Sequence, residues 1–184
     1  TTLSLLFGVS ASTEISTRAH LDGLPISAGY LFTTSNVGAD ATDSDPLAGT
    51  NRTALITLVS GQVETTVDAG FYRPAALGDF TWTDRNYNGQ QDGGETGLAS
   101  VVVTLYDAAS NVIGTRTSSA TGAYAFTNLV PGSYFVGFAP PAGHLFTTAN
   151  AGADATDSDP LAGTNRTALV TLTSGQTDVT VEAG

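Results

Sequence analysis

Oxygen-bearing side chains recur at fixed steps between Asp84 and Glu95. The stretch reads Asp-Arg-Asn-Tyr-Asn-Gly-Gln-Gln-Asp-Gly-Gly-Glu, with a glycine at its sixth position and a glutamate at its twelfth. This is the pattern of a calcium loop, which surrounds a hard cation with about six to eight oxygen ligands. The expected ligands are the carbonyl of Gln90 and the side chains of Asp84, Asn86, Asn88, Asp92 and Glu95. The alternative is a polar Asn-Gly turn without metal, but such a turn does not require the final glutamate.

The segments on both sides of this loop predict β-strands. Residues 77–83 alternate between apolar and polar side chains, and residues 101–106 read Val-Val-Val-Thr-Leu-Tyr. Alternation and β-branched residues are typical of strands, whereas an EF-hand requires a helix on each side of its loop. The loop is therefore expected to join strands, so that a bound metal would be structural and would not operate a helical switch.

Two further groups each place three aspartates within six residues. Carboxylates at such spacing repel one another unless water or a cation shields them. Glycine and proline flank both groups, which predicts a concave loop suited to a second cation, with a solvated acidic turn as the alternative. The groups are Asp154, Asp157 and Asp159, and Asp40, Asp43 and Asp45.

Both aspartate groups belong to an internal repeat. Residues 28–70 return as residues 142–184, and 9 of the 43 aligned positions differ. A repeat at an offset of 114 residues indicates tandem domains. We expect a complete domain at 77–184 and a partial one at 1–76, because residues 1–27 do not resemble residues 115–141, which precede the second copy.

Hydrophobic alternation predicts an all-β fold of tandem Ig-like antiparallel sandwiches. Strands are expected at 78–83, 101–107, 111–117, 122–127, 133–139, 145–148, 167–172 and 177–182. The predicted inward side chains are Phe80, Trp82, Val101, Val103, Leu105, Tyr124, Phe126, Tyr134, Val136, Phe138, Leu169 and Val181.

The first sandwich lacks several strands, which would expose a sheet edge. Residues 1–27 could rebuild the missing strands, a neighbouring chain could donate one by strand addition, or the chain could be a piece of a longer repeat protein. The second possibility predicts self-association into a filament or tandem array. A charged fraction of 12%, against about 25% in an average protein, also favours assembly because like subunits repel weakly.

Composition excludes several function classes. The net charge is −11 and lysine is absent, which argues against nucleic acid and anionic membrane surfaces as partners. No apolar stretch approaches the roughly 20 residues of a membrane span, so membrane insertion is not expected. Cysteine is absent, histidine occurs only at His20 and His144, and no nucleophile, phosphate-loop or zinc motif is present. We therefore expect no enzymatic activity.

The run from Leu77 to Gly143, which begins LGDFTWTDRNYNGQQDGGE, resembles the B-repeat domains of serine–aspartate-repeat surface adhesins. These are related to the B-type domains of collagen adhesins. The resemblance implies a calcium-binding Ig-like stalk module with metal ligands at the positions already named, and Asp79 and Asp107 as weaker candidates for the second site. Two departures are evident: Ser119–Gly122 replaces an acidic turn of the family, and without lysine no Lys–Asn isopeptide bond can form.

These observations predict a calcium-rigidified structural repeat of a bacterial extracellular protein, secreted or attached to the cell surface. It would act as a stalk, a spacer or a filament subunit. The alternative is a ligand-binding adhesin module that recognises a host protein or glycan, which would require an exposed aromatic or apolar patch of a few hundred Å².

Overall fold

The structure is a computed structural model of the 184-residue chain, and it describes residues 18–19, 28–47, 49–50 and 52–184. The chain divides into two compact units, Thr1–Arg73 and Pro74–Gly184. The described residues form strands, bridges and turns but no helix. Accordingly, this part of the chain offers no helix long and apolar enough to cross a membrane.

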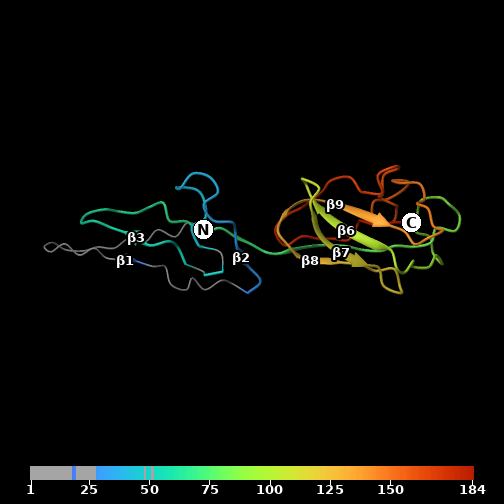
Figure 1. Cartoon of the computed structure of the whole chain (residues 1–184), viewed down its shortest axis with the longest axis horizontal. Helices are drawn as coiled ribbons and strands as arrows, with labels where there is room; N and C mark the ends of the chain where they lie inside the picture. The colour runs from blue at the N-terminus through green and yellow to red at the C-terminus, as the bar shows by residue number, and fades with distance from the viewer. Residues whose placement is uncertain (1–17, 20–27, 48, 51) are drawn as a thin grey trace. The chain divides into compact units, whose positions relative to one another are not determined.

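Two sheets build the unit Pro74–Gly184 (Figure 1). The larger sheet is antiparallel, in the order β10 (Val170–Leu172), β9 (Gly132–Ala139), β6 (Val102–Asp107) and β7 (Val112–Thr117). The smaller sheet has the order β11 (Thr177–Asp178), β5 (Ala75–Leu77) and β8 (Phe126–Leu129). β8 is antiparallel to β5, whereas β11 is parallel to it, which departs from the purely antiparallel sandwich expected from the sequence.

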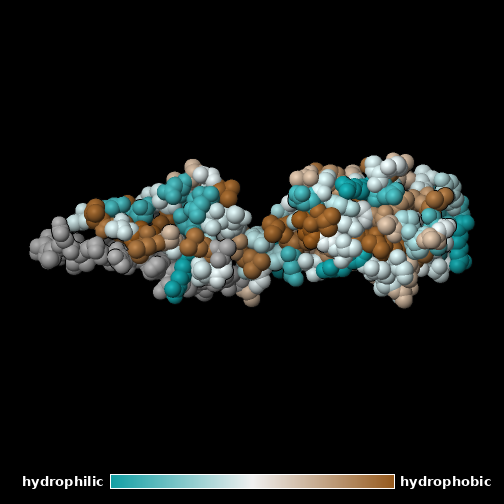
Figure 2. Space-filling view, viewed as in Figure 1, coloured by the Kyte–Doolittle hydropathy of each residue, from teal (hydrophilic) through white to brown (hydrophobic). Residues whose placement is uncertain are grey.

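The apolar core of this unit draws on both sheets. Side chains of a strand point alternately to its two faces, so that Val103 and Leu105 on β6 and Val136 and Phe138 on β9 are buried together. Leu77, Phe126 and Leu129 supply the opposite side. The predicted all-β sandwich class is therefore confirmed. Other apolar side chains reach the surface in scattered patches, as expected for a soluble domain (Figure 2).

Several predicted elements differ from the observed ones. β5 was not expected, yet its Ala75 and Leu77 are 1% exposed and pack in the core. Residues 80–82 form only isolated bridges, and residues 145–148 form no strand. β8 begins at Phe126, four residues after the predicted start at 122.

Two of the predicted inward residues are wrong. Leu169 is 49% exposed, whereas Leu172 is 2% exposed and Val170 packs against the core. Because side chains alternate, the register of β10 on β9, with Leu172 opposite Gly132, turns the even-numbered residues inward. Phe80 is only half-buried, although the neighbouring Thr81 and Trp82 are fully buried.

The unit Thr1–Arg73 contains two short antiparallel pairs in its described part. β1 (Arg18–Ala19) pairs with β3 (Ile56–Thr57), and β2 (Leu31–Phe32) pairs with β4 (Phe71–Tyr72). Apart from Pro46, the buried apolar side chains of the described residues all belong to the other unit. Apart from β1, the predicted role of residues 1–27 falls outside the residues that the structure describes.

Candidate metal centres

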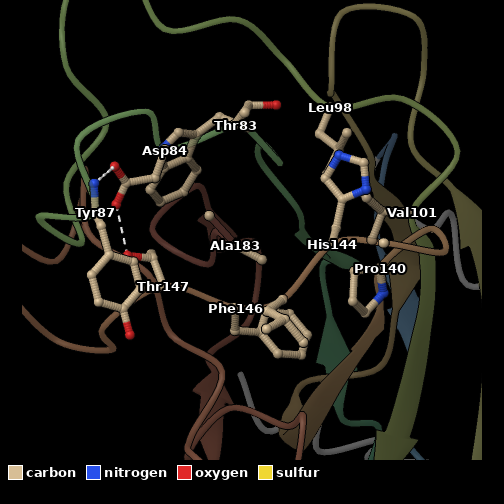
Figure 3. Close-up of a pocket in the computed structure, with 14 residues that line it drawn as sticks. Thr83, Asp84, Tyr87, Leu98, Val101, Pro140, His144, Phe146, Thr147 and Ala183 are labelled. Atoms are coloured by element: carbon tan, nitrogen blue, oxygen red, sulfur yellow. Dashed lines mark hydrogen bonds between the residues drawn. The ribbon is translucent and has the colours of Figure 1, made fainter.

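The loop from Asp84 to Glu95 is organised by its first residue. Asp84 Oδ1 accepts hydrogen bonds from the backbone N–H of Asn86 and Tyr87, at 3.1 and 2.6 Å. Its Oδ2 accepts bonds from the Gly89 N–H at 2.8 Å and the Thr147 hydroxyl at 2.7 Å (Figure 3 shows the bonds from Tyr87 and Thr147). Partial burial raises the pKa of Asp84, but these hydrogen bonds outweigh burial and the net pKa is lowered. The carboxylate is therefore ionised at neutral pH.

Three of the predicted ligands converge on one point. The amide Nδ2 atoms of Asn86 and Asn88 both donate to Asp92 Oδ2 at 2.8 Å. The Oδ1 atoms of the two asparagines accept the backbone N–H groups of Asn88 and Gln90, at 3.1 and 2.8 Å. The sequence spacing has thus brought the side chains at positions 3, 5 and 9 together.

Glu95 closes the loop with both carboxylate oxygens. Oε1 accepts the Arg85 N–H at 2.8 Å, and Oε2 accepts the Asp92 N–H at 3.0 Å. Gly89 adopts φ +80°, and a Cβ there would lie 2.4 Å from the Thr148 carbonyl oxygen. The sixth position therefore requires glycine both for its backbone angle and for its contact with residue 148.

The 84–95 loop packs directly on the loop that carries Asp154, Asp157 and Asp159. The sequence analysis did not predict this contact. The Gln91 N–H donates to the Thr156 carbonyl at 2.7 Å, and the Gln90 side-chain amide donates to the Ala151 carbonyl at 3.1 Å. Gln90 also forms a bridge with Asp157. Two segments more than 60 residues apart in sequence are thereby joined through backbone contacts.

The carboxylates of the second loop lie close together. Asp154, Asp157 and Asp159 each offer an oxygen within 4.8 Å of the other two. Asp157 is 3% exposed; its Oδ2 accepts the Gly152 N–H at 3.1 Å, but its buried Oδ1 has no hydrogen-bond partner. Asp159 Oδ2 accepts the Glu182 N–H at 2.6 Å, and burial raises the pKa of Asp159 to about 7.

Glu182 belongs to the same acidic cluster, and the sequence analysis missed it. Its side chain is 0% exposed, and neither carboxylate oxygen has a hydrogen bond of good geometry. Burial, followed by the charges of Asp79 and Asp159, raises the pKa of Glu182 to about 9. Burial also raises the pKa of Asp79 beside it. The sequence offered one signal for a buried carboxylate at this position: a charged residue stands between two apolar ones, Val181 and Ala183, which are both buried.

The first unit repeats this arrangement. Asp40, Asp43 and Asp45 again offer oxygens within 4.8 Å of one another, and Asp43 Oδ1 is buried without a partner. The Asp68 N–H donates to Asp45 Oδ2 at 2.6 Å, as Glu182 does to Asp159. Burial raises the pKa of Asp45. In the described part of the first unit, the three aspartates therefore come together without a neighbouring loop like that of residues 84–95.

Asp79 and Asp107, the weaker candidates for the second metal site, lie in different parts of the unit. Asp79 lies beside Glu182, whereas Asp107 lies in the turn between β6 and β7. There its carboxylate accepts the Asn111 side-chain amide at 2.9 Å and the Ala109 and Asn111 N–H groups, and hydrogen bonds led by Asn111 lower its pKa. Asp107 is thus a turn residue. In the nearby stretch from Ser119 to Gly122, Ser119 and Thr121 hydrogen bond to each other, and no carboxylate is present.

The fold and these loops define an all-β sandwich module whose polar turns carry clustered carboxylate and amide groups. Residues 75–184 match the family described as SdrD B-like domain. The chain belongs to the SdrD B-like domain family, which confirms the resemblance read from the sequence. The family consists of structural and adhesin repeats, so the expectation that the chain is not an enzyme is also confirmed.

Longer relatives share this sequence. The chain is 39% identical over 158 residues to serine-aspartate repeat-containing protein F of Staphylococcus epidermidis, covering 85% of the chain and 8% of the relative. It is 39% identical over 139 residues to the bone sialoprotein-binding protein of Staphylococcus aureus, covering 74% and 12%. A minor pilin of Streptococcus agalactiae aligns with a TM-score of 0.38 at 15% identity, over 70% of this chain and 57% of the pilin. The chain thus spans only a small part of its curated relatives.

Proposed function

We propose that the chain is a calcium-stiffened structural repeat of an extracellular bacterial protein, either secreted or attached to the cell surface. The observation that carries the proposal is the acidic cluster around the buried Asp157 and Glu182, with the half-buried Asp159 beside them. Asp157 Oδ1 and both carboxylate oxygens of Glu182 are buried without a hydrogen bond of good geometry. A buried charge without a partner is costly, and a divalent cation with oxygen ligands would offset that cost. Asp154 and Asp79 at the edge of the cluster would complete the ligand set.

The 84–95 loop would hold a second ion. Its residues fit the group by donor chemistry: the Asp92 carboxylate and the amides of Asn86 and Asn88 converge, and Asp84, the Gln90 carbonyl and Glu95 stand at the remaining ligand positions. Asn86 and Asn88 would have to turn their amide groups so that Oδ1 replaces Nδ2 beside Asp92. The cation would contribute charge neutralisation and would perform no reaction.

Both ions would act on the same part of the fold. The two loops are long and polar, and they contribute few side chains to the apolar core, so they are the places where the domain opens most easily. A site with Kd of about 10⁻⁴ M, at about 10⁻³ M calcium, stabilises the folded state by roughly 1.4 kcal/mol. Two such sites are significant against a typical domain stability of about 5–15 kcal/mol. A row of stiffened sandwiches suits a stalk, a spacer or a filament subunit.

We also propose that the chain associates with copies of itself. Among its described residues, the first unit buries no apolar side chain except Pro46, so additional β-structure would stabilise it. A second copy that adds a strand would give a filament or tandem array. Sedimentation or light scattering across a concentration series tests this; a monomer at every concentration would exclude it.

The exposed aromatic side chains do not support the alternative of a ligand-binding adhesin module. The exposed aromatic side chains among the described residues are Tyr30, Phe71 and Tyr87, and of these only Tyr87 belongs to Pro74–Gly184. A single exposed ring does not form a recognition patch.

Thermal unfolding in calcium and in chelator tests the calcium proposal. We expect calcium to raise the melting temperature of the chain and to slow protease cleavage near residues 84–95. Glu95→Gln removes a carboxylate from the loop and should lose about 1.4 kcal/mol of the calcium-dependent stabilisation. Glu64→Gln, the same change in the other unit and outside both loop types, is the control and should behave as the original chain. A melting curve that does not respond to calcium would refute the proposal.

A further inference from the structure

A cavity of about 200 Å³ opens beside the 84–95 loop in the unit Pro74–Gly184. Asp84, held by Tyr87 and Thr147, forms one side of it, and His144, Phe146 and Leu98 lie opposite (Figure 3). Trp82 and Gly184 also line the cavity. The metal loops leave this mostly apolar cavity unexplained.

One wall of the cavity, residues 143–147 and 183–184, lies in the internal repeat, and the first unit shows what pairs with its copy of that wall. Residues 29–33 correspond to residues 143–147, and Gly70 corresponds to Gly184. In the first unit Leu31 pairs with Tyr72, and Phe32 pairs with Phe71, as strands β2 and β4. The rings of Phe32 and Phe71 are 4.8 Å apart. The segment directly after Gly70 thus covers residues 31–32.

The first hydrogen bond of that pairing is already present in the second unit. The Thr33 N–H donates to the Gly70 carbonyl at 2.9 Å, and the Thr147 N–H donates to the Gly184 carbonyl at 3.1 Å. Beyond this bond the units differ. Leu31 is 46% exposed and lies in a strand, whereas Leu145 is 92% exposed and lies in none. Leu145 and Phe146 therefore present an unpaired edge at the mouth of an apolar cavity.

We propose that this edge and cavity receive an extended aromatic segment of the β4 type, joined to Gly184 as Phe71–Tyr72 is joined to Gly70. Its first residue would contact Phe146, the counterpart of Phe32, and its second would pair with Leu145. The segment acts as a covering strand that seals the end of each repeat, so that the residues between two modules belong structurally to the preceding one.

The cavity suits an aromatic ring. Its volume of about 200 Å³ exceeds the roughly 150 Å³ of an engineered apolar cavity that binds benzene. The Trp82 Nε1 is buried without a hydrogen-bond partner, and the adjacent Cε2 atom lies against Gly184. An incoming backbone carbonyl would give this N–H an acceptor. Arg73 lies over the Tyr30 ring at 5.8 Å, and His144 replaces that tyrosine in the second unit, so the third position of the segment should matter less there.

Extending the chain tests the proposal. One variant carries Phe-Tyr-Arg after Gly184, copying residues 71–73, and the control carries Ala-Ala-Arg. Antiparallel pairing bonds alternate residues, so the amide after Thr147 in the ladder is that of Leu145. We expect Phe-Tyr-Arg to slow hydrogen exchange of the Leu145 amide by about tenfold, to raise the melting temperature above that of the control and to shift the emission of Trp82, the single tryptophan.

Each result of this experiment either supports or contradicts the covering segment. Exchange at Leu145 that is equal in both extensions would overturn the proposal, as would a Trp82 spectrum that does not respond. Protection by Ala-Ala-Arg alone or by both extensions would show a sequence-independent strand and would refute the aromatic requirement. A free Phe-Tyr-Arg peptide that protects Leu145 as strongly as the fused segment would refute the covalent arrangement. None of these readouts requires calcium, so they are independent of the proposed metal binding.

Discussion

Replacing Glu182 by glutamine should stabilise the calcium-free protein at neutral pH. The Glu182 side chain is fully buried beside Asp79, and its carboxylate oxygens make no hydrogen bond of good geometry. Its pKa is raised from 4.5 to about 9, chiefly by burial, so the folded chain binds a proton that the unfolded chain releases. Stability from this group is complete below pH 4.5 and declines as pH rises towards 9. Glutamine does not ionise and escapes that decline.

The magnitude follows from the pH interval. Between 4.5 and 7.5, each pH unit corresponds to about 1.36 kcal/mol, which gives an upper limit of about 4 kcal/mol at pH 7.5. Asp79 and Glu182 titrate together, so part of the proton uptake persists in the variant, and we expect about 1–2 kcal/mol. For a domain of about 100 residues, each kcal/mol shifts the melting temperature by about 4–8 °C.

Trp82 fluorescence reports the unfolding of this unit, because the tryptophan is buried there and is the single one in the chain. In chelator at pH 7.5, Glu182→Gln should melt at a higher temperature than the original chain, and at pH 4.5 the two should coincide. Asp154→Asn is the matched control: it removes a charge from the same cluster, but its side chain is exposed, so it should gain little. In calcium the difference should shrink, because Glu182→Gln lacks a ligand and forgoes roughly 1.4 kcal/mol of calcium-dependent stabilisation.

A Glu182→Gln variant that melts at or below the temperature of the original chain in chelator at pH 7.5 would refute the reasoning. It would mean that the carboxylate has an effective partner in the folded state. A gain that is the same at pH 4.5 and pH 7.5 would also contradict it, since the predicted effect arises from ionisation of the unfolded chain.

Two other perturbations probe the loops. Gly89→Ala should destabilise the unit Pro74–Gly184 by about 1–3 kcal/mol in thermal unfolding, because the alanine would have to adopt φ +80° and its Cβ would lie 2.4 Å from the Thr148 carbonyl oxygen. Gly93→Ala is the control and should be nearly neutral, because a Cβ there meets no atom within 4 Å. Equal destabilisation by the two substitutions would contradict this geometry. The calcium-induced rise in melting temperature should grow from pH 5 to pH 8, because the cation competes with protons for Asp159, whose pKa is about 7, and for Glu182; a rise independent of pH would exclude these residues as ligands.

Much of the local structure was readable from the residues. The spacing from Asp84 to Glu95 predicted a closed polar loop, and positions 3, 5 and 9 do meet at Asp92 Oδ2. Alternation identified β6 and β9, because every second side chain of a strand faces the core. The 114-residue repeat predicted that the two aspartate groups would share one arrangement, and both place their carboxylate oxygens within 4.8 Å.

Long-range pairing could not be read in this way. The inward set of β10 depended on its register against β9, and a shift of one residue exchanges the two faces, which is why Leu172 and not Leu169 is buried. Residues 145–148 were predicted as a strand but form none, because a strand also needs a partner edge. In the first unit the corresponding residues 31–32 form β2, because they pair with β4.

The sequence by itself determined the strand-rich character, the tandem repeat and the ligand-like spacing of the loop, because each depends on residues close together in the chain. Only the tertiary structure brought Glu182 and Asp79 to the aspartates of residues 154–159 and set Gln91 against Thr156. These contacts join segments that are distant in sequence, and they depend on how two sheets pack across a shared core. Burial, which gives Glu182 its raised pKa, is a property of that packing and has no local signature.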